Sequence, residues 1–575
     1  MVLDRRFWLM WLVSVWTAFF SMDVHMGGVL SRHVLKVAFY GLLFFYLCYF
    51  VLDFLPVKLE NGLKNVLLIL SLSFAFLDFF TSHCFSMGFN QALIETILAT
   101  NRSEIHAFLV GVLLPHIGVL VGFLLFCGLF LFLMRFKISL KRRQAGLVFA
   151  LFLGGIAAHS IRTGYNLQQG PSGYVVNLII ASHLTPILKE TTAILDTIHN
   201  RAQAKRIYTN FNQPYPKDYL GVDKDSVPNV VLIIGESASR DFMGIYGYSV
   251  PNTPFLSGLL REREREKAIL LTPTLLAKPN INQPVPPPSN LFVFPNVIAP
   301  FGSTMAVFQV LLNYGDAENH NTPWYQQKNI GSIFNLAGYA TFWLDNQEEP
   351  GASNAYSLTA HHFDHLFYTP ISFKKLYDGA LIDTFNDKVK PKLQTRNFIL
   401  FHFIGSHLLY KERFPKDFAT FTPKDINYQG LHAHNDQDKQ IVADYVNSLY
   451  YTDHVLSEIF KLFQGKDAII FYLSDHAQDI FQSASTYGHK CSSYGVEIPF
   501  MVYVTSTFKQ KHPEKVKLIE QAVHKPFMSD DLIHTLLPIV GIHTKDNLES
   551  KDLFSPKFDT KRKRVFCGDK PYSKP

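Results

Sequence analysis

Five long apolar segments within the first 165 residues constrain the fold of this chain more than any other feature of its sequence. They cover residues 7–20, 37–55, 65–82, 107–134 and 145–161. Most of them approach the roughly 20 residues that a helix needs to cross a bilayer. The first has the length of a signal-peptide core, but no small-residue cleavage pattern follows it, so we interpret it as an anchor. Residues 1–165 are therefore predicted to form a transmembrane domain of five helices.

The lysine and arginine residues of the loops predict the orientation of these helices, because cytoplasmic loops carry an excess of both. One side carries Arg5, Arg6, Lys58, Lys64, Arg135, Lys137, Lys141, Arg142 and Arg143, and the other carries Arg32, Lys36 and Arg102. The N-terminus is thus expected in the cytoplasm, and five crossings place the chain after about residue 162 outside. In a bacterium, this predicts a multi-pass inner-membrane protein with a periplasmic second half.

Three ionisable residues, Asp53, Asp78 and His116, lie within or near the apolar segments. Ionisable residues at such positions are functional candidates. Asp53 and Asp78 lie near segment ends, which favours an interfacial position for both. His116 follows Pro115, and this favours a local kink with a hydrogen-bonded histidine.

Residues 166–226 are predicted to form interfacial helices and a linker. The stretch from 174 to 198 is apolar but is interrupted by His183, Pro186, Lys189 and Glu190. These interruptions favour helices that lie in the membrane interface over a sixth crossing. The polar residues that follow are typical of a linker to a soluble domain.

Residues 227–560 alternate between short apolar runs and polar, helix-like stretches, which indicates an α/β domain with a mainly parallel sheet. Strands are predicted at 229–235, 339–345, 397–405, 468–475 and 499–505, and helices at 328–337 and 441–463. The charged run at 261–267 and the proline-rich stretch at 272–290 are interpreted as exposed insertions.

Charge and cysteine content argue against two classes of function. The net charge of +7 is modest for 575 residues and gives no support for nucleic-acid binding; the basic cluster at 561–564 is interpreted as part of a solvated tail, 561–575. The five cysteines include no CxxC pair, so a thiolate zinc cluster is not expected. Cys491 and Cys567 alone lie in the polar part, and the sequence leaves open whether they form a disulfide.

Acidic and imidazole side chains follow three of the predicted strands. Glu236 follows the strand at 229–235, and His407 follows the strand at 397–405. Asp475 ends the strand at 468–475, and His476 is the next residue. Ligands of open α/β sheets bind beyond the carboxyl ends of strands, and these residue types suit zinc or a similar divalent ion. Glu236 or Asp475 alone would serve equally well as a helix cap. Because three strands deliver such side chains to one edge of the sheet, a metal site is favoured.

Six motifs resemble those of the phosphoethanolamine transferases, membrane enzymes of the alkaline phosphatase superfamily. They are GESASRDFMGIYGY (235–248), FGSTMAVFQVLLNYGD (301–316), FHFIGSHLLYKERFP (401–415), YYTDHVLSEI (450–459), YLSDHAQDIFQSASTYGH (472–489) and VEIPFMVYV (496–504). The resemblance covers nearly the whole chain. It implies an N-terminal five-helix transmembrane domain, an interfacial linker and a periplasmic alkaline-phosphatase-like, or sulfatase-like, α/β domain.

The resemblance places the zinc ligands at Glu236, Thr304, Asp475 and His476, and it makes Thr304 the nucleophile as well. Thr304 lies where a glycine-containing loop leads into a predicted helix, whose backbone N–H groups would face a phosphate. Ser303 is the alternative nucleophile if the register is shifted by one residue.

Four further residues are implied to bind the substrate: His407 and His489 near the phosphate, and Asn346 and Gln347 in the donor pocket. Ser237, a second hydroxyl beside Glu236, is disfavoured as the nucleophile.

The chain departs from the family pattern at two points. Where the family commonly reads SDHGE, this chain has SDHAQ, with Ala477 and Gln478, so a second metal stays open while the primary zinc site is expected. Two periplasmic cysteines cannot form the several disulfides of the lipid A-modifying branch. The segment FQVLLNYGD and the TPWY that follows it look closer to the branch that modifies the inner-core sugars of lipopolysaccharide.

The resemblance implies that phosphoethanolamine moves from phosphatidylethanolamine, through a covalent threonine intermediate, to lipopolysaccharide, lipid A or another envelope glycan. A phosphoglycerol transferase or a sulfatase of the same superfamily is the alternative, although the Cys/Ser-x-Pro-x-Arg motif typical of sulfatases is absent. An inactive membrane scaffold that binds lipid or glycan is a second alternative.

Overall fold

The computed structural model describes residues 1–20, 27–85, 88–89, 93–94, 97–98, 100, 105–106, 108–167, 185–208, 215–261, 290–318, 322–347, 355–369, 377–568 and 570–573. The chain divides into two compact units, Met1–Leu98 with Phe108–Asn200, and Ala99–Ala107 with Arg201–Pro575. The predicted insertions at 261–267 and 272–290 lie almost entirely outside the described residues, as does the first part of the stretch 174–198.

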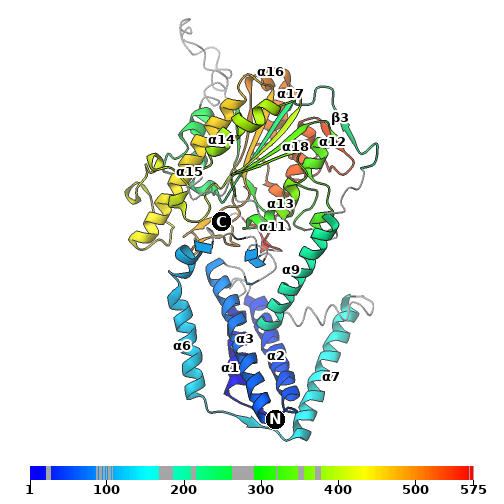
Figure 1. Cartoon of the computed structure of the whole chain (residues 1–575), viewed down its shortest axis with the longest axis vertical. Helices are drawn as coiled ribbons and strands as arrows, with labels where there is room; N and C mark the ends of the chain where they lie inside the picture. Colours follow the sequence, from blue (N-terminus) through cyan, green and yellow to red (C-terminus); the bar gives the residue numbers. More distant parts are fainter. Residues whose placement is uncertain are drawn as a thin grey trace. The chain divides into compact units, whose positions relative to one another are not determined.

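The first unit has a helix at each of the five apolar segments (Figure 1). They are α1 Arg5–Phe20, α2 Gly27–Leu52, α3 Val57–Phe85, α6 Ile117–Leu133 and α7 Arg142–Leu167, and α9 Pro186–Tyr208 begins in this unit. Among the described residues, His33–Leu52 and Val57–Phe85 are long and apolar enough to cross a membrane, and Ile117–Leu133 is a shorter apolar helix. The helices lie where the sequence predicts them, and the number of crossings stays a prediction.

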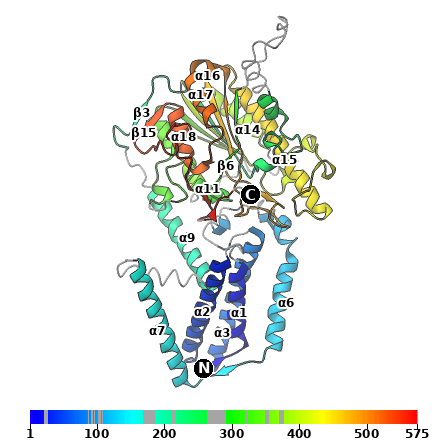
Figure 2. The same cartoon turned by 180° about the vertical axis from the view of Figure 1, so that it is seen from behind.

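The helices of the first unit share an apolar core but also expose apolar side chains. Helix α1 packs against α2 and α3 (Figure 2), and its Phe7 shares the core with Tyr49 of α2. On the outside, Leu125 and Phe132 of α6 and Leu151 of α7 are 68%, 77% and 75% exposed. Water-soluble proteins rarely expose large contiguous apolar patches, so these outer faces suit lipid.

The two aspartates of the apolar segments both have cationic partners. Asp53 follows α2 and pairs with the N-terminal ammonium of Met1 at 2.9 Å. The neighbouring backbone is fixed by pairing of β1, Val2–Leu3, with β2, Ile138–Ser139. Asp78 is buried in α3 and pairs with Lys189 of α9.

The fourth apolar segment is interrupted at its histidine. A turn at residues 114–116 separates the π-helical η2, Leu109–Leu113, from α6. The Nδ1 atom of His116 lies 2.8 Å from the carbonyl oxygen of Val112. The structure therefore has the local kink and the hydrogen-bonded histidine that the sequence predicts.

A seven-stranded sheet of order β5-β13-β10-β4-β9-β7-β8 forms the centre of the second unit. The strands are β4 Asn229–Gly235, β5 Leu291–Phe294, β7 Ala340–Asp345, β8 His365–Tyr368, β9 Asn397–His402, β10 Ala468–Ser474 and β13 Phe500–Val504. From β10 to β8 all neighbours are parallel, whereas β13 is antiparallel to β10 and β5. The predicted mainly parallel sheet is confirmed, and β5, β8 and the reversal of β13 are additions to it.

Strand β4 is buried on both faces. Val230, Leu232 and Ile234 belong to one core cluster, and Val231 and Ile233 belong to the other. A strand that is covered on both sides reads as a continuous apolar run, which explains this part of the sequence.

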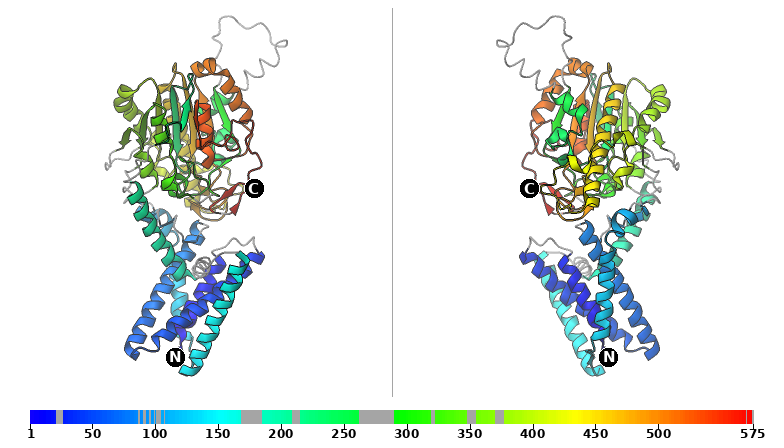
Figure 3. Two further views of the ribbon diagram at one scale, coloured as in Figure 1. Left: turned by 90° about the vertical axis from the view of Figure 1, so that its right-hand side faces the viewer. Right: turned by 90° about the vertical axis from the view of Figure 1, so that its left-hand side faces the viewer.

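Helices cover both faces of the sheet (Figure 3). Those on one face include α12 Ile330–Leu336, α13 Ala355–Ala360, α16 Ser506–Lys511, α17 Pro513–Ala522 and α18 Leu532–Ile539, and those on the other are α14 Ala380–Thr384 and α15 Asp436–Leu462. The shorter elements are α11 Thr304–Phe308 and the pairs β3 Leu220–Val222 with β15 Ile542–Thr544, β6 Val297–Ile298 with β14 Phe527–Met528, β11 Asp479–Ile480 with β12 Tyr487–Gly488, and β16 Val565–Phe566 with β17 Lys570–Pro571.

The strand register brings four carboxyl ends to one edge of the sheet. Gly235 of β4 lies opposite Ser474 of β10, and Asp345 of β7 lies opposite His402 of β9. The residues that follow these strands therefore meet at the same edge, as the sequence predicts.

Candidate metal centre and active site

Glu236 extends from the end of β4 into a fully buried position. It is 1% exposed, and its carboxylate accepts a hydrogen bond of 2.5 Å from the hydroxyl of Ser237. Ser237 has a φ of 62°, a left-handed conformation that is uncommon for a residue with a side chain. Its hydroxyl also accepts a hydrogen bond from Gln478 at 2.9 Å. Ser237 thus orients Glu236, and its exclusion as the nucleophile stays a prediction.

Asp475 and His476 follow β10, the parallel neighbour of β4, and both are fully buried. The Nε2 atom of His476 lies 3.3 Å from Glu236 and 3.5 Å from Oδ2 of Asp475. Its Nδ1 lies 2.9 Å from the carbonyl oxygen of Ala477. Because a carbonyl oxygen can only accept, Nδ1 carries a hydrogen atom. Burial opposes protonation of the ring, but the charges of Asp475 and Glu236 raise the pKa of His476 to about 9, so Nε2 also carries a hydrogen atom at pH 7 and would give it up to bind a cation.

Thr304 is the first residue of α11, and its side chain reaches the same point. Its hydroxyl donates to Oε2 of Glu236 at 3.0 Å and lies 3.2 Å from Nε2 of His476. Ser303, the alternative nucleophile, is the N-cap residue of α11. The structure therefore brings together all four residues that the resemblance assigns as zinc ligands.

These four side chains fit a divalent cation. Their oxygen and nitrogen atoms converge in a buried space, and Oδ2 of Asp475 has no hydrogen-bond partner among the described residues. The ligand atoms of Glu236, Asp475 and His476 all lie within 4.8 Å of one another. Burial and the charge of Glu236 raise the pKa of Asp475. Such mutual repulsion between carboxylates is what a bound cation relieves, and the mixed oxygen and imidazole set is one that zinc accepts.

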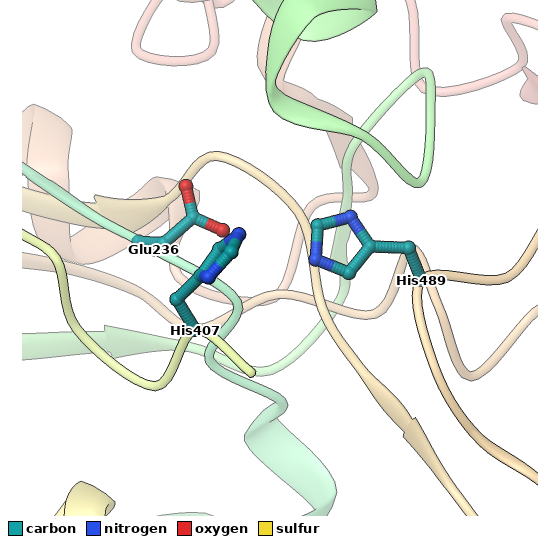
Figure 4. A group of neighbouring side chains, drawn as sticks. All are labelled: Glu236, His407 and His489. Atoms are coloured by element: carbon teal, nitrogen blue, oxygen red, sulfur yellow. The ribbon is translucent and has the colours of Figure 1, made fainter. Parts of the chain in front are cut away.

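His407 and His489 lie beside Glu236 (Figure 4). A nitrogen of each lies within 4.8 Å of a Glu236 oxygen and of the other histidine. Burial lowers the pKa of His407 to about 4 and the pKa of His489 well below its usual value, so both rings are neutral at pH 7. His407 Nδ1 and His489 Nε2 are buried and have no hydrogen-bond partner within the described part of the chain, so a phosphate or a second cation could supply one.

The two predicted donor-pocket residues differ in their surroundings. The amide of Gln347 lies against the metal centre, with Nε2 3.4 Å from Glu236 and 3.0 Å from the carbonyl oxygen of Phe403. Asn346 instead donates to Asp378 at 2.8 Å and accepts from Thr369 at 2.9 Å. Its amide is thus engaged within the protein.

His402 is a residue of this site that the sequence interpretation missed. It is fully buried at the end of β9, and its Nδ1 lies 3.0 Å from Oδ2 of Asp345. Its Nε2 lies 3.1 Å from the amide nitrogen of Gln347. A histidine within an otherwise apolar strand was the available signal, and its connection to Asp345 across two strands was not visible in the sequence.

The departure from the family pattern at Gln478 has a structural counterpart. Its amide donates to Ser237, and its oxygen accepts from the hydroxyl of Tyr410 at 2.8 Å. The residue therefore supports the orientation of Ser237. Cys491 and Cys567, which the sequence left open, form a disulfide.

A family model described as Sulfatase matches residues 228–280 and 278–542, more than half of the chain. The chain belongs to the sulfatase family. Glu236, Thr304 and Asp475 all lie within the matched residues.

A curated relative, the phosphoethanolamine transferase EptC of Escherichia coli O18:K1:H7, is 25% identical over 365 residues. The alignment covers 60% of this chain and 56% of the relative, so the chain matches little more than half of that protein's length. The relative confirms the resemblance to phosphoethanolamine transferases, and EptC fits the branch that the sequence indicated.

Two solved structures share the fold. The C-terminal periplasmic domain of E. coli EptC in complex with Zn has a TM-score of 0.51 and 22% identity, and it covers 60% of this chain and 91% of that one. The integral membrane lipooligosaccharide phosphoethanolamine transferase A of Neisseria meningitidis has a TM-score of 0.58 and 17% identity, and it covers 95% of this chain and 97% of that one. Together with the family match, these likenesses confirm the sulfatase-like fold of the predicted α/β domain.

Proposed function

We propose that this chain is a metal-dependent phosphoethanolamine transferase. Its donor is phosphatidylethanolamine, and its acceptor is lipopolysaccharide, lipid A or a similar envelope glycan. The convergence of the Thr304 hydroxyl with Glu236, Asp475 and His476 carries this proposal. A hydroxyl within a buried set of metal ligands is the arrangement that an activated nucleophile requires.

We place the chain in a bacterial inner membrane, with five crossing helices in residues 1–165 and a cytoplasmic N-terminus. Residues 166–226 lie at the interface, 227–560 form the periplasmic catalytic domain, and 561–575 form a tail. The exposed apolar side chains of α6 and α7 support this placement. Because the donor and the acceptor are both lipids, an anchored enzyme searches for them in two dimensions.

Zinc is the proposed cofactor, held at one primary site by Glu236, Thr304, Asp475 and His476. When bound, it lowers the pKa of a ligating hydroxyl and neutralises charge on a phosphoryl group. The EptC domain whose fold the chain shares was solved as a complex with Zn. Glu236, His407 and His489 form a second group of potential ligands, so a second ion has candidate ligands even though Gln478 is not acidic.

The reaction proceeds in two displacements on Thr304. Its Oγ1 attacks the phosphorus, the bond to the glycerol oxygen breaks, and diacylglycerol leaves. An acceptor oxygen then attacks the phosphothreonine and releases Thr304. The proton of the Thr304 hydroxyl leaves towards the groups that this hydroxyl faces, Glu236 at 3.0 Å and Nε2 of His476 at 3.2 Å, and the leaving glycerol oxygen takes a proton from solvent. His407 and His489 lie beside Glu236, where they can bind the phosphoryl oxygens.

The proposal is tested with detergent-purified, zinc-loaded protein and labelled phosphatidylethanolamine. Diacylglycerol release is expected from the wild type and from Ser303→Ala, and is expected to be lost in Thr304→Ala. Phosphatidylglycerol serves as the competing donor. Release from phosphatidylglycerol alone would identify a phosphoglycerol transferase, and stoichiometric zinc with no release from either lipid would favour a scaffold.

A further inference from the structure

Asp378 is a buried carboxylate behind the active site that none of the sequence motifs includes. It precedes α14 and is 2% exposed. Carboxylates are almost never fully buried unless they are well paired. The donors of the hydrogen bonds that compensate for its burial show which parts of the chain Asp378 holds in place.

The carboxylate of Asp378 joins two loops that follow neighbouring strands. Its Oδ1 accepts from the side-chain amide of Asn346, after β7, at 2.8 Å. The same oxygen accepts from the backbone N–H of Ile404, after β9, at 2.9 Å, and Oδ2 accepts from the N–H of Gly405 at 2.9 Å. All three donors are uncharged, and two of them belong to one turn.

This turn, residues 404–407, lies directly against the backbone of Glu236. Gly405 has a φ of +46°, and a Cβ atom on it would lie 2.6 Å from the carbonyl oxygen and 2.9 Å from the nitrogen of Glu236. The N–H of Ser406 donates to the same carbonyl oxygen at 2.9 Å. The turn then ends at His407. Its position therefore determines where Glu236 and His407 lie relative to each other.

We infer that Asp378 is a positioning residue of this active site, which holds the 404–407 turn so that Glu236 and His407 face the same substrate atom. This inference rests on the proposed function. Asp378 does not touch the reacting atoms. It acts by fixing the backbone N–H groups of Ile404 and Gly405. Their turn carries His407 and contacts the backbone of Glu236.

The variant Asp378→Asn tests this with almost no change in volume. The amide oxygen of the asparagine can still accept the hydrogen bonds made to one carboxylate oxygen. Its NH₂ group replaces the other oxygen and faces a backbone N–H, so two donors oppose each other where a hydrogen bond was. A displacement of this kind next to the reacting groups typically lowers the rate about 10- to 100-fold. We expect kcat for diacylglycerol release to fall by that factor, with KM for the donor changed less than threefold.

Asp453→Asn is the matched control. Asp453 on α15 is 1% exposed and likewise accepts two backbone N–H groups, from Phe255 at 2.9 Å and Leu256 at 3.0 Å. Those groups lie outside the loops of the active site. The control should lower thermal stability to a similar degree as Asp378→Asn while kcat stays within twofold of wild type.

Amide hydrogen exchange of the full-length protein, followed by mass spectrometry of peptides covering 398–409, gives a readout that does not depend on activity. Protection of the 404–405 amides should be lost in Asp378→Asn and kept in Asp453→Asn. Unchanged protection in Asp378→Asn would overturn the inference, as would lost protection with full kcat, or an equal loss of kcat in the control. If the wild type releases no diacylglycerol, the proposed function fails, and hydrogen exchange still decides whether Asp378 holds the turn.

Discussion

Ser237 is not one of the proposed metal ligands, but it contacts Glu236, which is. Its hydroxyl donates to Glu236 and accepts from Gln478, so it fixes the direction in which the Glu236 carboxylate points. Its strained backbone conformation, with φ at 62°, indicates that this orientation is maintained at a cost. Partners of this kind typically contribute 10- to 100-fold to metal affinity.

We therefore expect Ser237→Ala to bind zinc about 10- to 100-fold more weakly than the wild type. Competition with a metal chelator measures this. The matched control is Ser239→Ala, because Ser239 is equally buried two residues away and its hydroxyl has no hydrogen-bond partner in the described ranges. Equal zinc affinity in Ser237→Ala and the wild type would contradict the assigned role.

The sequence predicts the residues of this site well where each follows a strand or lies in a motif. Glu236, Asp475 and His407 could be placed because parallel strands end at a common edge. His402 and Asp378 could not, because their roles depend on hydrogen bonds to residues that are distant in the sequence. Asn346 was assigned to the donor pocket, yet its amide bonds to Asp378.

At the scale of elements, the disulfide ties the C-terminal strands to the active-site loops. Cys491 lies two residues after His489, and its partner Cys567 donates its backbone N–H to the carbonyl oxygen of Pro300 at 2.8 Å. Pro300 belongs to the loop that leads to Thr304. The crosslink therefore supports both the loop that precedes Thr304 and the loop that carries His489.

Cys567→Ser is expected to lower the free energy of unfolding of the second unit by about 2–4 kcal/mol, since the crosslink restricts the unfolded chain. Because both loops lose their common support, kcat should fall as well. Chemical denaturation and the diacylglycerol assay measure the two effects. The double variant Cys491→Ser/Cys567→Ser should match the single one, and a double variant with wild-type stability and activity would show that the disulfide is dispensable.

Helix α18 contains a histidine that makes the stability of the second unit depend on pH. His534 is buried against Tyr314, and its Nδ1 accepts the N–H of Leu548 at 3.1 Å. Burial, together with the charge of Lys551, lowers the pKa of His534 to about 4, although Asn547, Asp530 and Asp316 oppose this shift. The folded state therefore favours the neutral ring.

The folded pKa of His534 lies below the unfolded value of 6.5, so its contribution is complete above pH 6.5 and is lost as the pH falls towards 4. At pH 5, the loss is about 2 kcal/mol relative to pH 7. His534→Gln keeps an acceptor for Leu548 but does not titrate. Urea unfolding at both pH values should show a weaker pH dependence in this variant, and an unchanged dependence would contradict the assignment.

The sequence predicts the central elements of the sheet better than its edges. Strand β4 and its parallel neighbours are long apolar runs because both of their faces are covered. Strands β5 and β8 have only four residues each and lie at the two edges of the sheet, where short runs carry little signal. The reversal of β13 depends on its pairing with β10 and β5, which its own residues do not encode.

At the scale of the whole molecule, the proposed function requires the second half of the chain to lie in the periplasm, while the loop between α6 and α7 lies in the cytoplasm. The apolar segments and the unequal distribution of lysine and arginine predict this from the sequence. Single cysteines introduced at two exposed lysines test it: Lys137 in the loop between α6 and α7, and Lys557 in the second unit. In spheroplasts, whose inner membrane is intact, a thiol reagent that does not cross membranes should label position 557 and not position 137. The reverse pattern would contradict the topology.

The central claim is that Thr304 carries the transferred group. The most direct measurement is peptide mass spectrometry of the zinc-loaded protein after incubation with phosphatidylethanolamine and no acceptor. We predict one phosphoethanolamine adduct, on Thr304, that is absent in Glu236→Ala. An adduct on Ser303 or Ser237, or diacylglycerol release with no adduct at all, would contradict the account.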